Sequence, residues 1–141
     1  LVFRSLGDRS EVRIHKIQDG FSVYVPVPGP DEEEVEQRVQ IRFPSAGEAE
    51  DDDAIVNVFA DSGVESSPAL HERLLELNAR LPVGAVAIME IEGQKRLVMI
   101  HNHLRSTLDP PEIGKSVLGI ARFTQRLARR VRDLSTDGAQ Q

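Results

Sequence analysis

Apolar and polar residues alternate along most of the first half of the chain, with the two-residue period of β-strands. The alternation is seen over residues 11–18, 21–27 and 38–43, with a turn signal at Asp19-Gly20 after the first of these segments. Residues 54–60 are apolar at nearly every position, which is typical of an interior strand. Because the alternating segments keep one polar face, the pattern predicts an antiparallel sheet.

The second half changes to a helix–strand–strand–helix pattern over residues 67–134. Ser67 and Pro68 are typical of a helix start, and Pro82 stops the helix. Its apolar face is made by Leu70, Leu74, Leu77 and Leu81. Residues 85–91 are apolar on both faces, so we expect this strand in the centre of the sheet, with residues 96–104 returning beside it after a turn at Glu92-Gly93.

A long helix closes the chain. It starts at Asp109, which can cap the first turn, and the prolines that follow fit that turn. Its inner face is formed by Ile113, Val117, Ile120, Thr124, Leu127, Val131 and Leu134. We therefore predict one α+β domain with a strand-rich part over residues 1–66, and a frayed tail over residues 135–141. The fold is a mostly antiparallel, curved sheet of five to seven strands, with two helices packed against it.

The segment Leu74-Leu75-Glu76-Leu77-Asn78 is followed by a glycine-led strand pair and then by the proline-led start of the closing helix. In these features residues 70–134 resemble the YbjN-type domain, whose fold is similar to that of the type III secretion chaperones. In that family an N-terminal helix precedes the first strands, whereas residues 1–6 here indicate an edge strand or the end of a lost helix. The resemblance implies a secretion-chaperone-like fold, frequent dimerisation and a binding or chaperone-like role, without catalytic residues.

Composition and charge narrow the classes of function. The 141 residues include no cysteine, which excludes disulfides, thiolate catalysis and cysteine-ligated zinc. The net charge of -6 argues against general nucleic-acid binding, because phosphate attraction needs clustered positive charge. No apolar run approaches the ~20 residues that span a bilayer. We expect a cytoplasmic protein without membrane contact. The start at Leu1 rather than at a methionine is typical of a fragment of a longer protein.

His101 and His103 are the candidate metal ligands. Two residues apart on a strand, they point to the same face, and such a pair can hold Zn²⁺ with a third histidine or a carboxylate. His15 and His71 contribute only if the fold brings them close. The simpler interpretation is a polar end to a strand whose other face is buried.

The last helix carries the candidate partner-binding residues Arg122, Arg126, Arg129 and Arg130. The spacing places the first three on one side of the helix, where they can bind an acidic partner, an anionic ligand or phosphate. The alternatives are a solvated helix face, or contact with the acidic runs of the same chain or of a second copy. These runs cover residues 31–36 and 48–53, and the second lacks the spacing of a calcium-binding loop.

The sequence contains no motif that assembles a catalytic site. Serines occur at Ser62, Ser66 and Ser67, but no nucleophile-elbow motif surrounds them. We therefore expect a non-enzymatic protein-interaction or chaperone-like module that binds a protein partner or itself, most simply as a homodimer, without a cofactor. The alternatives are a metal-binding domain or metal-dependent hydrolase built on the two strand histidines, and an anion or nucleic-acid contact through the arginines.

Overall fold

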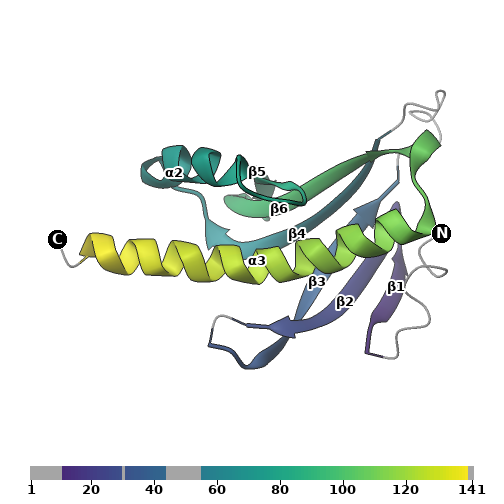
Figure 1. Ribbon diagram of the computed structural model, residues 1–141, viewed down its shortest axis with the longest axis horizontal. Coiled ribbons are helices and arrows are strands. Elements are labelled where there is room, and N and C mark those ends of the chain that lie inside the picture. Colours follow the sequence, from purple (N-terminus) through teal and green to yellow (C-terminus); the bar gives the residue numbers. More distant parts are fainter. Residues whose placement is uncertain (1–10, 30, 44–54, 140–141) are drawn as a thin grey trace.

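The structure is a computed structural model that describes residues 11–29, 31–43 and 55–139, with side chains through residue 134. In these ranges six strands form one curved antiparallel sheet, and two α-helices pack against it (Figure 1). The predicted α+β class is confirmed. The strands are β1 (Arg13–Ile17), β2 (Gly20–Pro28), β3 (Glu34–Arg42), β4 (Ile55–Glu65), β5 (Ala85–Ile91) and β6 (Gln94–Leu104); the helices are α2 (Pro68–Asn78) and α3 (Pro110–Ala139), with a short 3₁₀ helix η1 (Arg105–Thr107) before α3.

The strand order is β1-β2-β3-β4-β6-β5, so the sheet follows the chain except at its last two strands. The buried faces of β2 and β3 are those that the alternation of apolar and polar residues predicted. The face toward α3 buries Val23, Val25 and Val27 of β2, Val39 and Ile41 of β3, and Val56, Val58 and Ala60 of β4. The segments 1–6 and 48–53, for which the sequence suggested a strand or helix end and an acidic run, lie outside the described residues.

The hairpins β1–β2 and β5–β6 each contain a tight turn, and only the second turn has the predicted geometry. Ile91 pairs with Gln94, and between them Glu92 and Gly93 both have positive φ, as a two-residue hairpin turn requires. In the first hairpin Ile17 pairs with Gly20, which makes Gly20 the first residue of β2 rather than a turn residue. Glycine is needed there for close approach, because a Cβ would lie 1.8 Å from the carbonyl oxygen of Ile41.

The long helix α3 covers one face of the sheet and contacts β2, β3, β4 and β6 (Figure 1). The backbone N–H of Glu112 donates to Asp109 Oδ1 at 2.9 Å, so the predicted N-terminal cap is present. The predicted inner stripe is buried from Ile113 to Val131, with Leu134 half-buried. The helix runs to Ala139, into the segment predicted as a frayed tail. No helix in the described part of the chain is long and apolar enough to cross a membrane.

The strand β5 lies at the edge of the sheet, which corrects the prediction of a central position. It pairs with β6 only, and α2 packs beside it (Figure 1). Apolar residues on both faces of a strand indicate that both faces are covered. They do not indicate whether a neighbouring strand pairs with each of its two edges. The helix α2 begins at Pro68 as predicted, but the Ser67 side chain makes no cap hydrogen bond.

Candidate functional site

An exposed apolar surface lies where α2 meets β5. Leu75 of α2 is 70% exposed and Ile88 of β5 is 45% exposed, although both side chains are large and apolar. Between them is a hollow of about 300 Å³. We call this the α2–β5 surface; it consists of His71, Leu74, Leu75, Asn78, Val86, Ala87, Ile88 and Leu97. Exposed apolar side chains that gather at one place, rather than singly, mark a binding surface.

The side chain of Asn78 connects α2 to the edge of β5. Its Oδ1 accepts from the backbone N–H of Val86 at 2.6 Å, and its Nδ2 donates to the carbonyl oxygen of the same residue at 3.2 Å. The amide thus takes the place of a neighbouring strand at one position. The contact ties the last residue of α2 to the backbone of β5.

The Asn78 contact also shows which part of the β5 edge remains open. Since both backbone groups of Val86 face away from β6, the alternation of an antiparallel ladder makes those of Ile88 and Glu90 face the same way. Within the described residues no backbone partner occupies these two positions. An open edge of this kind can pair with a strand from another chain.

His101 and His103 lie on the face of β6 that α3 covers, opposite Val58 and Val56 of β4. They share one face as predicted, with ring centroids 4.1 Å apart. Both side chains are half-buried, and α3 brings Ser116 Oγ within 3.0 Å of His101 Nδ1. His103 Nε2 is buried and has no hydrogen-bond partner in the described residues.

Burial lowers the pKa of both histidines, and the charge of Glu112 on α3 acts in the opposite direction. The imidazoles are therefore neutral at pH 7, the form that binds metals. Among the described residues, however, no third histidine, cysteine, aspartate or glutamate completes a metal site with them. His15 contacts Tyr24, and His71 contacts Ser66, so neither joins the pair. The metal site stays a prediction.

Two serine–histidine contacts arise that spacing in the sequence did not reveal. Ser66 Oγ lies 3.0 Å from His71 Nε2, and Ser116 Oγ lies 3.0 Å from His101 Nδ1. A nucleophilic serine also needs a group that orients the histidine. In the described residues no carboxylate is hydrogen-bonded to either histidine, so neither contact forms a catalytic triad.

The four candidate arginines of α3 separate onto two sides of the helix. Arg122, Arg126 and Arg129 border a hollow of about 640 Å³ together with the loop after β2, including Glu32. Arg130 faces α2 instead. Beside the first group, Arg132 donates to Asp31 Oδ1 at 3.2 Å, so the start of the acidic run, at Asp31 and Glu32, lies next to arginines of its own chain. A contact within the chain was one of the predicted alternatives; binding of a partner by these arginines stays a prediction.

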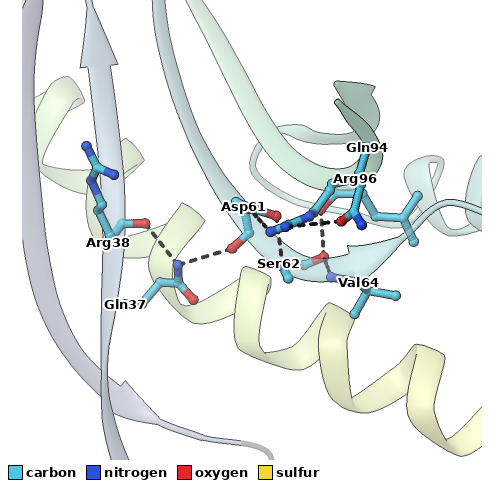
Figure 2. Close-up of polar contacts among 9 residues, drawn as sticks. Gln37, Arg38, Asp61, Ser62, Val64, Gln94 and Arg96 are labelled. Carbon is cyan, nitrogen blue, oxygen red and sulfur yellow. Dashed lines mark hydrogen bonds and ion pairs between the residues drawn. The ribbon is translucent and has the colours of Figure 1, made fainter. Parts of the chain in front are cut away.

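On the sheet, a polar network holds a bulge in β4 (Figure 2). Asp61 Oδ2 accepts from Arg96 at 2.8 Å, and Ser62 Oγ donates to the carbonyl oxygen of Leu97 at 2.6 Å. Gln37 Nε2 donates to the backbone oxygens of Arg38 and Asp61. The network fixes the strand irregularity between β4 and β6. It places the Ser62 hydroxyl in a structural hydrogen bond rather than beside a base.

No family model matches the chain, and no curated protein matches its sequence.

Leu75, Ile88 and the open edge of β5 did not emerge from the sequence as a site. Leu75 carries a signal, since it is an apolar residue that lies off the face made by Leu70, Leu74 and Leu77. Ile88 carries none, because an apolar residue in an apolar strand looks like a core residue.

Proposed function

We propose that the chain is a non-enzymatic protein-interaction module that associates with a second copy of itself through the α2–β5 surface. The observation that supports this most directly is an apolar strand at the sheet edge, with exposed Ile88 beside exposed Leu75. We extend the proposal to a chaperone-like role in the cytoplasm, of the kind implied by the resemblance to YbjN-type domains.

A second copy is the simplest partner for this edge. Two β5 strands related by a twofold axis run antiparallel, so that the open groups around Ile88 and Glu90 of one copy can pair with those of the other. The same rotation brings both copies of Leu75 and Ile88 to one interface, where their apolar side chains leave water. Asn78 limits the pairing to the part of β5 beyond Val86.

The test is the solution mass, measured by light scattering over a range of protein concentrations, with wild type expected as a dimer. In Ile88→Glu the twofold axis places two added carboxylates near each other, so the dissociation constant of the dimer should rise at least about tenfold. The matched control is Ile55→Glu, because Ile55 is 49% exposed but lies on β4. Leu75→Glu should act like Ile88→Glu.

A monomer at every concentration would refute the proposal, as would a dimer that Ile55→Glu weakens and Ile88→Glu leaves intact. Circular dichroism of each variant shows that the fold is retained. Chelator treatment and a metal assay of the same sample test the alternative built on His101 and His103. A stoichiometric transition metal would favour that alternative.

A further inference from the structure

A second hollow, on the opposite side of α2, is bordered by three arginines. It has a volume of about 260 Å³ and lies between α2 and the C-terminal part of α3. Arg73 and Arg80 come from α2 and Arg130 comes from α3. Leu74, Leu77 and Leu134 also line it. We call it the arginine hollow.

The charge of the arginine hollow is unbalanced. Glu76 is the only carboxylate among its described lining residues. Within the described residues, no carboxylate oxygen lies within 4.0 Å of Arg73, Arg80 or Arg130. Three guanidinium groups beside one carboxylate leave a net positive charge, which favours an anionic partner, because each guanidinium can form charge-assisted hydrogen bonds to carboxylates.

The size and lining of the hollow further define the partner. Small-molecule pockets usually measure about 300–1,000 Å³, and this hollow is smaller. It fits one apolar side chain of a longer molecule, resting on the leucines, with the arginines placed for acidic groups on either side. A polyanion without apolar groups would leave the leucines unused.

From these features we propose that the arginine hollow binds an acidic peptide segment of a partner protein, with an apolar side chain on the leucines and flanking carboxylates on the arginines. This goes beyond the proposed self-association, since it uses the other side of α2 and a different partner. Arg130, which the sequence grouped with the arginines of α3, acts here with two arginines of α2.

The test is fluorescence anisotropy of the whole chain with a labelled peptide of alternating Asp and Leu residues. We expect binding that weakens with added salt, since screening reduces charge attraction. Arg80→Gln combined with Arg130→Gln should weaken binding by at least about tenfold. Two comparison peptides, with Asn for Asp and with Ser for Leu, should each bind more weakly than the original.

The matched control is Arg42→Gln combined with Arg105→Gln, which removes the same charge from β3 and η1 and should leave peptide binding within about twofold, a small change in free energy. Ile88→Glu should also leave peptide binding unchanged, so that the two proposals can fail separately.

Several results would overturn the proposal: no binding of the Asp–Leu peptide to wild type, equal binding of the Asn peptide, or equal loss in the control pair. The contact would lie on the other side of α3 if peptide binding were lost in Arg122→Gln combined with Arg126→Gln but kept in the Arg80 and Arg130 double variant. Binding of a DNA duplex, with none of the peptide, would show that the ligand is nucleic acid.

Discussion

At the scale of single residues, the polar side chains under α3 are the least expected feature. His101 and His103 stand in a position of β6 that otherwise holds core residues, beside Leu97 and Met99. Only His101 has a hydrogen-bond partner, Ser116, and His103 Nε2 is buried without one in the described residues. A buried polar atom without a partner lowers the stability of the fold, and the loss of stability is larger when the ring gains a proton and becomes charged.

The histidine pair predicts that the protein loses stability as the pH falls. Burial lowers the pKa of both rings from the ordinary value of 6.5 in the folded state. The unfolded chain therefore binds more protons as the pH falls through 6.5, and the free energy of unfolding decreases until the folded-state pKa is passed. Glu112 reduces the effect, since its charge favours the protonated rings.

The measurement is the urea midpoint between pH 8 and pH 5, for wild type and for His101→Gln combined with His103→Gln. Glutamine does not titrate, so the variant should show a smaller fall over this range. His15→Gln, at an exposed position of β1, is the control and should follow wild type. If the double variant and wild type fall in parallel, the histidines do not cause the acid sensitivity.

At the scale of elements, the Asn78–Val86 contact predicts how α2 is held. Asn78→Ala removes both hydrogen bonds to the backbone of Val86, which should lower the free energy of unfolding by about 1–2 kcal/mol. Hydrogen exchange at the Val86 amide should become faster. The control is Asn102→Ala, because among the described residues the exposed Asn102 side chain bonds only the side chain of Asn57, and its loss should stay within about 0.5 kcal/mol. Unchanged exchange at Val86 would contradict this account.

The same elements show what the sequence could predict. Local periodicity and caps gave the strand faces, the start of α3 at Asp109 and its inner stripe, because they depend on neighbours in the chain. The edge position of β5 depends on which strand pairs with β6, and alternation contains no information about that choice. The arginine hollow was missed for a similar reason, because Arg80 and Arg130 meet only through the packing of α2 and α3.

At the scale of the whole molecule, α3 joins the two parts of the sheet. One part consists of the strands β1 to β4 and the other of β6 and β5, and in the sheet they are connected only by the pairing of β4 with β6. The helix α3 packs across β2, β3, β4 and β6, so it contacts both parts. Gln125 of α3 adds a polar contact, since its Nε2 donates to Gln37 Oε1 on β3 at 2.6 Å. A helix that packs on both parts of a sheet should make them unfold together.

This arrangement predicts that one cavity under α3 weakens the entire sheet. Ile120 is fully buried on the inner face of α3, and Ile120→Ala should lower the free energy of unfolding by about 2–5 kcal/mol. Because α3 contacts both parts, hydrogen-exchange protection should fall by a similar factor in β2 and in β6. Arg122→Ala, at an exposed position of the same helix, should change stability by no more than about 0.5 kcal/mol. Loss of protection in β6 alone would mean that the two parts of the sheet unfold independently, and that α3 does not make them one cooperative unit.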